Sequence, residues 1–206
     1  MKRLLSILFT LLVALGATAQ RVNEAAVKQQ INTAASRIRT MQCDFVQTKH
    51  MRMLNDKMVS KGVMYYAQPN KLRWQYTSPY TYTFVLSGSQ VMMNKGKKSQ
   101  VIDVSQSKVF KEITRIMMNS VVGKCLTDGN DFKSAIADGK TEWIVTLTPL
   151  KKNMKQMFSS IKVRFNKQRS MVSAVELYEK NGDRTVIELS NVRTNISLNA
   201  QLFSVK

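Results

Sequence analysis

Apolar and polar side chains alternate along most of the chain. Met41, Cys43 and Phe45 share one face of a predicted strand, and Gln42 and Asp44 lie on the other face. The same period of two predicts further strands over residues 57–66, 70–77, 80–87, 90–95, 98–103, 131–137, 141–148, 157–165, 171–179 and 184–190, with a short end strand at Leu202–Phe203.

Two segments change to the helical period. Residues 23–39 place Val27, Ile31 and Ile38 at helical spacing, and Asn23 can cap the first turn. Residues 105–126 form the second helical segment, in which the apolar positions are Val109, Ile113, Ile116, Met117 and Val121. The sequence therefore predicts two or three helices beside about eleven strands.

Most predicted strands are apolar on one face only, which is typical of antiparallel sheets. Pro69 and Pro79 mark strand ends, and Asn181-Gly182 is a hairpin turn signal. We expect a mainly β, α+β protein built on one large, curved antiparallel sheet that helices cover on its concave face. A β-sandwich is the alternative.

The N-terminus has the features of a secretory signal peptide. Lys2 and Arg3 precede the apolar run LLSILFTLLVALG, which is shorter than the roughly 20 residues of a membrane span, and Ala17-Thr18-Ala19 follows. We expect cleavage after Ala19, export, and a single domain over residues 20–206. No cysteine stands directly after the apolar run, where a lipoprotein would carry its acylated cysteine, so we do not expect this chain to be a lipoprotein itself.

The protein is strongly basic. Removing Lys2 and Arg3 from the formal charge of +19 leaves 19 − 2 = +17 in the mature chain. Export argues against nucleic acid as the partner, so this charge favours anionic lipid surfaces or acidic proteins, or serves solubility alone. The sequence leaves these alternatives open.

Catalytic patterns are missing from the sequence. His50 is the only histidine, and in a regular strand it points away from Cys43, which argues against a Cys-His dyad. Glu176 and Glu179 also fall on opposite faces, and we interpret both as solvated edge charges. No metal-binding motif is present, so we expect no enzyme, no cofactor and no metal. Cys43 and Cys125 allow either a disulfide or two buried thiols.

The chain resembles the LolA family of periplasmic carriers of outer-membrane lipoproteins. The resemblance rests on these elements in order: Phe45-Val46-Gln47-Thr48-Lys49, Gly62, Met64-Tyr65-Tyr66, Pro69-Asn70-Lys71-Leu72-Arg73-Trp74, Pro79, Ser87-Gly88, Trp143 to Pro149, Asn153, Lys155, Phe158, Val175-Glu176-Leu177 and Leu202-Phe203. It implies an incomplete, unclosed antiparallel β-barrel with a lid of two or three α-helices over an apolar cavity.

The resemblance also implies a site. The cavity for acyl chains would be lined by Phe45, Met64, Leu72, Trp74, Tyr76, Tyr82, Phe84, Leu86, Val163 and Phe165, and the lid would present Ile113, Ile116, Met117 and Val121. An arginine before the Pro-Asn pair holds the lid in well-known members. This chain has Gln68 there, so Gln68 or Arg73 is the candidate latch. Ordinary core packing is the alternative reading of each cavity residue.

The implied partners follow from the same resemblance. They are acylated lipoproteins, an inner-membrane lipoprotein-releasing ABC transporter and an outer-membrane acceptor, served by a periplasmic monomer. Two alternatives share the fold: a carrier of other lipids or lipid-linked molecules, and a periplasmic lipoprotein sensor.

Overall fold

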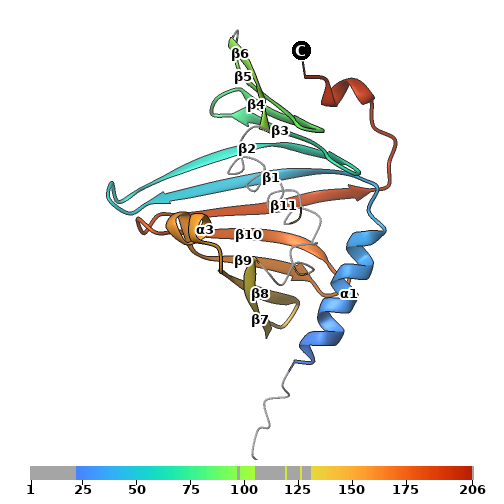
Figure 1. Cartoon of the computed structure of the whole chain (residues 1–206), viewed down its shortest axis with the longest axis vertical. Helices are drawn as coiled ribbons and strands as arrows, with labels where there is room; N and C mark the ends of the chain where they lie inside the picture. Colours follow the sequence, from blue (N-terminus) through green and yellow to red (C-terminus); the bar gives the residue numbers. More distant parts are fainter. Residues whose placement is uncertain (1–21, 97, 105–118, 120–125, 127–130, 206) are drawn as a thin grey trace, which may run out of the picture.

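The computed structural model describes residues 22–96, 98–104, 119, 126 and 131–205. In this part of the chain, eleven strands form one antiparallel sheet in the order β6-β5-β4-β3-β2-β1-β11-β10-β9-β8-β7 (Figure 1). The strands are β1 Thr40–Met51, β2 Asp56–Ala67, β3 Lys71–Ser78, β4 Tyr82–Ser87, β5 Gln90–Lys95, β6 Lys98–Asp103, β7 Phe132–Asp138, β8 Glu142–Pro149, β9 Phe158–Asn166, β10 Met171–Glu179 and β11 Arg184–Thr194.

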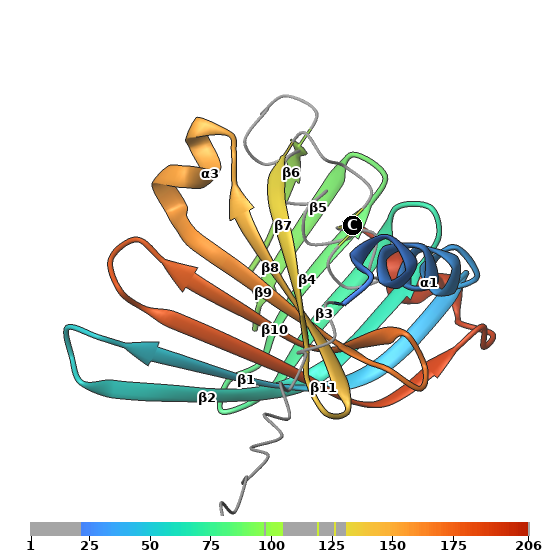
Figure 2. The same cartoon turned by 90° about the horizontal axis from the view of Figure 1, so that it is seen from below.

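The sheet is not closed. Strands β6 and β7 end the strand order, while β1 pairs with β11 in the middle and so joins the two halves of the chain. In Figure 2 strands β1 and β2 lie low on the left, and β6 and the upper end of β7 lie well above them, so the sheet bends into an open half-barrel. The predicted α+β class and unclosed antiparallel barrel are confirmed, and the β-sandwich alternative is wrong.

Helix α1, Glu24–Ser36, confirms the first helical prediction. The side chain of Asn23 caps it, because Oδ1 accepts a hydrogen bond from Ala26 N at 3.1 Å. Val27 and Ile31 are buried against the sheet. The face that α1 contacts is called the inner face below.

Two short elements differ from the sequence predictions. Helix α3, Lys152–Met157, follows β8 and was not predicted. The predicted end strand is wrong, because Leu202 and Phe203 belong to a 3₁₀ turn, η3 Ala200–Phe203, which the side chain of Asn199 caps. Strands β2 and β11 already pair with the two edges of β1, so the C-terminal segment cannot add a strand there. It contacts β3 and β4 on the outer face of the sheet.

The predicted lid residues belong to a part of the chain that the structure does not describe. Ile113, Ile116, Met117 and Val121 lie outside the described residues, as do the signal peptide and Cys125. Within the part of the chain that is described, no helix is long and apolar enough to cross a membrane.

The inner face carries two apolar clusters. The α1 cluster lies under α1 and is built mainly on β7 to β10; Val163 and Phe165 belong to it, both with an exposed fraction of 0%. The aromatic cluster lies mainly on β1 to β5 and contains Phe45, Met64 and Trp74 among its buried members. The sheet therefore has one half sealed by a helix and a second half built around aromatic rings.

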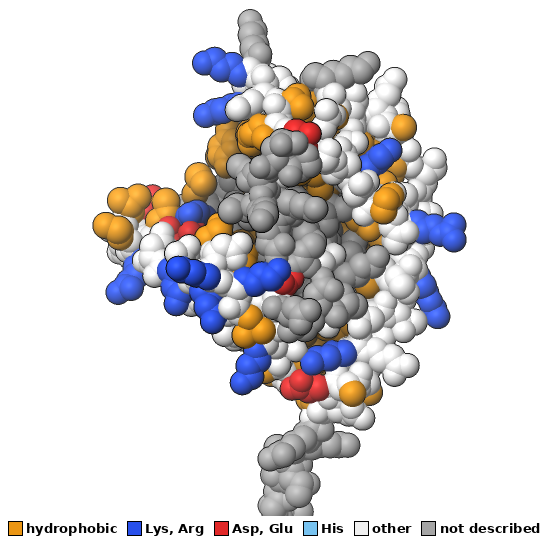
Figure 3. All heavy atoms as spheres, in the orientation of Figure 1, with side chains coloured by type: hydrophobic (Ala, Val, Ile, Leu, Met, Phe, Trp, Pro, Cys, Tyr) orange, Lys and Arg blue, Asp and Glu red, His pale blue; other side chains and the backbone are white. Residues whose placement is uncertain are grey.

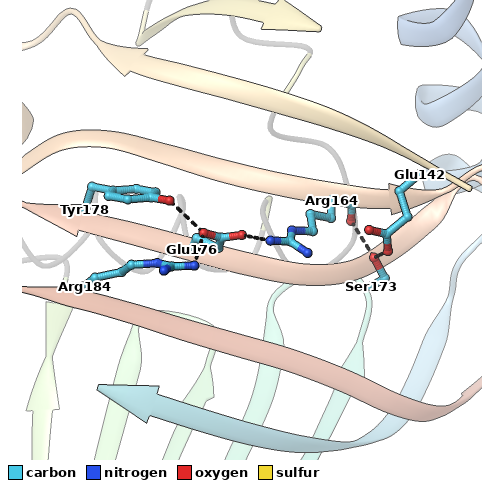
Figure 4. Close-up of polar contacts among 6 residues, drawn as sticks. All are labelled: Glu142, Arg164, Ser173, Glu176, Tyr178 and Arg184. Atoms are coloured by element: carbon cyan, nitrogen blue, oxygen red, sulfur yellow. Dashed lines mark hydrogen bonds and ion pairs between the residues drawn. The ribbon is translucent and has the colours of Figure 1, made fainter. Parts of the chain in front are cut away.

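The outer face of β9 to β11 holds a buried carboxylate. Glu176 is 2% exposed and pairs with Arg164 and Arg184, while Tyr178 Oη donates to Glu176 Oε2 at 2.8 Å (Figure 4). Burial raises its pKa, but the hydrogen bonds from Tyr178 and the two arginines outweigh that effect, so the pKa is lowered overall. The interpretation of Glu176 as a solvated edge charge is wrong, because strands on both sides of β10 supply cations that compensate its burial.

Candidate functional site

Three cross-strand rows of side chains build the aromatic half of the inner face. They arise because the antiparallel registers place the inward positions of neighbouring strands directly opposite one another. The first row is Met41, Tyr66, Leu72, Leu86, Val91 and Ile102; the second is Cys43, Met64, Trp74, Phe84 and Met93; the third is Phe45, Gly62, Tyr76 and Tyr82.

Gly62 gives the third row its shape. A Cβ atom at this position would lie 2.6 Å from Phe45 Cζ and 1.9 Å from the carbonyl oxygen of Gln75. The missing side chain lets the Phe45 ring lie against the strand backbone. The ring centroid of Phe45 is then 4.4 Å from that of Trp74 and 5.2 Å from that of Tyr76, the latter edge-on. Glycine therefore sets the packing of the aromatic rings.

Exposure increases across the rows. Phe45, Met64, Leu72 and Leu86 are at most 4% exposed. The half-buried members of the rows are Tyr76, Tyr82, Phe84 and Met93, from the three adjacent strands β3, β4 and β5, and Ile102 of β6. The first four, called the aromatic surface below, retain solvent contact. Such a contiguous, partly exposed apolar surface is suited to contact with another apolar group.

The titratable groups of this face are neutral at physiological pH. Burial, reinforced by the nearby Asp44, raises the pKa of the Cys43 thiol to about 12. Burial and the neighbouring Tyr80 raise the pKa of the Tyr76 phenol to about 12. Tyr76 Oη donates to Gln47 Oε1 at 2.9 Å, which satisfies that hydroxyl at the edge of the face. The surface is therefore uncharged.

Trp74 contributes one polar atom to this face. Its indole Nε1–H is buried and, among the described residues, makes no well-formed hydrogen bond, although it lies near enough to the Tyr76 phenol to oppose the rise of that group's pKa. A buried donor without a partner carries a desolvation cost, which an incoming acceptor would relieve.

The two candidate latch residues occupy different faces. Gln68 is half-buried just after β2, and its side chain hydrogen-bonds to Tyr66 on the inner face. Arg73 lies on the outer face, where Nη1 donates to the carbonyl oxygen of Leu202 at 3.2 Å and Nε donates to Gln75 Oε1 at 3.1 Å. Arg73 thus binds the C-terminal segment, and this placement lends its latch role no support.

Eight of the ten predicted cavity residues belong to the aromatic half: Phe45, Met64, Leu72, Trp74, Tyr76, Tyr82, Phe84 and Leu86. Val163 and Phe165 do not, because they are fully buried in the α1 cluster. The sequence analysis missed Met93, Val91 and Tyr66 as members of the face. Extending the register across the turn between β4 and β5 would have placed Met93 opposite Phe84.

Cys43 and His50 confirm the argument against a dyad. The Cys43 thiol is free and buried on the inner face, whereas His50 is exposed near the end of β1. Within the described residues, no group of three or more His, Cys, Asp or Glu side chains could hold a metal ion.

The fold and the site together define a class of protein: open antiparallel half-barrels whose inner face carries an apolar, uncharged aromatic surface. The chain belongs to the LolA family of outer membrane lipoprotein carrier proteins, whose family model matches residues 36–206.

Two outer-membrane lipoprotein carrier proteins are similar to this chain over most of their length. The outer-membrane lipoprotein carrier protein of Chromobacterium violaceum is 25% identical over 204 residues, which cover 96% of this chain and 91% of that protein. The protein of the same name from Methylococcus capsulatus is 25% identical over 180 residues, covering 87% of this chain and 83% of that protein.

Solved structures share the fold at low identity. An uncharacterized conserved protein from Thermus thermophilus matches with a TM-score of 0.54 and 9% identity, covering 86% of this chain and 93% of that one. MucB in its complex with MucA from Pseudomonas aeruginosa matches with a TM-score of 0.54 and 11% identity, covering 88% of this chain and 61% of that one. At such identity the likeness concerns the fold alone.

Proposed function

We propose that this protein carries acylated lipoproteins through the periplasm from the inner to the outer membrane, with their acyl chains held against the aromatic surface. Family membership supports a lipoprotein carrier. The observation that carries the proposal is the half-buried run of Tyr76, Tyr82, Phe84 and Met93 beside fully buried aromatic rings.

Shielding of the acyl chains is the task that this surface would perform. Each exposed CH₂ group costs about 0.8 kcal/mol in water, so a multiply acylated protein cannot cross an aqueous compartment unaided. An uncharged face of aromatic rings and methionine replaces that water without desolvating a charge. The Nε1–H of Trp74, which makes no well-formed hydrogen bond within the described part of the chain, would donate to an ester or amide carbonyl at the head of an acyl chain.

The surrounding parts of the mechanism rest on the sequence. Cleavage after Ala19 would release the carrier into the periplasm. The segment with Ile113, Ile116, Met117 and Val121 would act as the lid that acyl chains displace, with Gln68 as its latch. An inner-membrane ABC transporter would supply the cargo, an outer-membrane acceptor would receive it, and no catalysis is involved.

The test is release of a radiolabelled lipoprotein from spheroplasts into the purified carrier, read out as a soluble complex on size exclusion. Phe84→Glu places a carboxylate on the half-buried surface of β4. We expect at least a tenfold loss of complex, because pressing a charge against hydrocarbon costs more than the ~1.4 kcal/mol that a tenfold change represents.

Val101→Glu is the matched control, since Val101 is 45% exposed on β6 and its side chain points to the outer face. This variant should extract lipoprotein as the wild type does. The proposal is wrong if the wild type releases no lipoprotein, or if Phe84→Glu extracts it normally. Mass spectrometry of molecules copurified from the periplasm separates a lipoprotein carrier from a carrier of free lipids.

A further inference from the structure

Three turns meet at one end of the strands. They are residues 51–56 between β1 and β2, residues 179–184 between β10 and β11, and residues 150–158 with α3, and they lie together on the left in both Figure 1 and Figure 2. The first turn projects beyond the neighbouring strand, because β3 pairs with β2 only as far as Lys61. This set of three turns is called the turn end.

Hydrogen bonds fix the three turns to one another. Arg52 N donates to Asp183 Oδ1 at 3.0 Å, and Lys180 N donates to the carbonyl oxygen of Met157 at 3.0 Å. Lys49 Nζ lies 3.6 Å from Asp183 Oδ2 and 3.4 Å from Glu179 Oε1. The turn end is therefore one connected surface.

Apolar side chains are concentrated on this surface. Seven large hydrophobic residues of the described chain are exposed, and four of them lie here: Met53 (91%), Leu54 (70%), Leu150 (44%) and Met157 (39%). Met53 and Leu54 stand at the tip of the projecting turn. Side chains as exposed as these two do not pack in the core of this chain, which indicates an interaction surface.

The charges around the apolar tip are almost all positive. The exposed Lys and Arg residues of the three segments are Arg52, Lys151, Lys152, Lys155 and Lys180, of which Lys151 is paired with Asp131; Lys57 directly follows the first turn, and the one exposed carboxylate within the segments is that of Asp56. In Figure 3 basic side chains gather beside the projecting apolar tip. Glu179 and Asp183 are already paired with Lys49.

We propose that the turn end docks on the surface of a phospholipid bilayer that carries anionic headgroups. Met53 and Leu54 insert among the headgroups while the lysines of α3 and neighbouring turns contact the lipid phosphates, which is how a small apolar tip and a basic surface cooperate at membranes. The inference goes beyond the proposed function and does not depend on acyl chains bound to the inner face.

The test is cosedimentation of the mature protein with vesicles of phosphatidylcholine alone or of equal parts phosphatidylcholine and phosphatidylglycerol. We expect binding to the anionic vesicles only, and its loss at high salt. The double variant Met53→Ser, Leu54→Ser should lower the partition coefficient at least tenfold. It should keep the wild-type melting temperature and lipoprotein binding, because both side chains are exposed.

Charge reversal supplies the matched pair. In the double variant Lys152→Glu, Lys155→Glu, each substitution should lower the partition coefficient onto anionic vesicles about fivefold or more. Lys140→Glu with Arg169→Glu changes the net charge equally, but these residues lie in exposed turns at the opposite end of the strands, so partitioning should change less than about threefold.

Three results would each overturn the inference: no binding of the wild type to anionic vesicles at low salt, wild-type binding by the Met53 and Leu54 variant, or equal losses from the two charge reversals. None of these readouts involves lipoprotein transfer. A failure here therefore leaves the proposed function standing, and the reverse also holds.

Discussion

Gly62→Ala is the substitution with the most direct structural consequence. The added methyl group would lie 1.9 Å from the Gln75 carbonyl oxygen and 2.6 Å from Phe45 Cζ. The oxygen belongs to the backbone of β3 and cannot rotate away, so the two strands must separate locally. The ring of Phe45 must lift as well, which disturbs its contacts with Trp74 and Tyr76.

The expected cost can be worked from these contacts. Overpacking of a well-filled core costs about 1–3 kcal/mol. Loss of an aromatic pair adds about 0.5–1.5 kcal/mol, while the smaller entropy of the unfolded alanine chain returns about 0.4–1 kcal/mol. These terms sum to a fall of about 0.5–4 kcal/mol in the free energy of unfolding. Because the 1.9 Å contact is with a backbone atom, we expect the upper half of this range, about 2–4 kcal/mol, which for a chain of this size corresponds to a melting temperature lower by about 5–15 °C.

Urea unfolding followed by tryptophan fluorescence measures this change. Gly96→Ala is the control, since Gly96 has a φ of +63° but nothing within 4 Å of the added atom. Gly96→Ala should lower the free energy of unfolding by only roughly 1–2 kcal/mol, the cost of holding a residue with a Cβ atom in the left-handed conformation. The reasoning is refuted if Gly62→Ala unfolds within about 0.5 kcal/mol of the wild type, or if Gly96→Ala is the more destabilised variant.

Three further predictions concern single contacts. Arg73→Ala removes the hydrogen bond to Leu202, so carboxypeptidase should trim the C-terminus several-fold faster than in the wild type, and an unchanged rate would contradict the contact. Because the pKa of Glu176 is lowered on folding, its contribution to stability is present above the unfolded pKa of about 4.3 and is lost as pH falls through the folded pKa. Acid unfolding of the wild type should therefore be steeper below about pH 4 than that of Glu176→Gln, and parallel curves would refute this. In a Cys125→Ser background the Cys43 thiol, with its pKa near 12, should react with iodoacetamide at pH 8 at least a hundredfold more slowly in native protein than in urea, and equal rates would count against its burial.

The alternation of side chains predicted the eleven paired strands of the described chain because most of them bury one face; β6 is an exception, with no buried residue. The ends of the strands were less accurate, since pairing between distant segments decides them. Strand β11 continues to Thr194 because Met41 of β1 pairs with it, and β4 begins at Tyr82 rather than Tyr80. Helix α3 has only six residues, too few for a helical period to be seen.

The candidate site could be predicted only in part. Alternation placed Phe45, Trp74 and Phe84 on apolar strand faces, and the family resemblance implied a cavity there. The rows depend on register, which a single strand does not encode. The burial of Glu176 likewise depends on arginines from the two strands beside it. Val163 and Phe165 have the same alternating pattern as Trp74, and only the position of α1 separates core from candidate surface.

Under the proposed function, the division of the inner face into two clusters would separate folding from loading. The half under α1 is buried by the chain itself, so it would hold the sheet together while the aromatic half exchanged occupants. Cargo of different length would then be accommodated by local rearrangement, without repeated partial unfolding. A carrier built in this way can be emptied at its destination and return intact for another cycle.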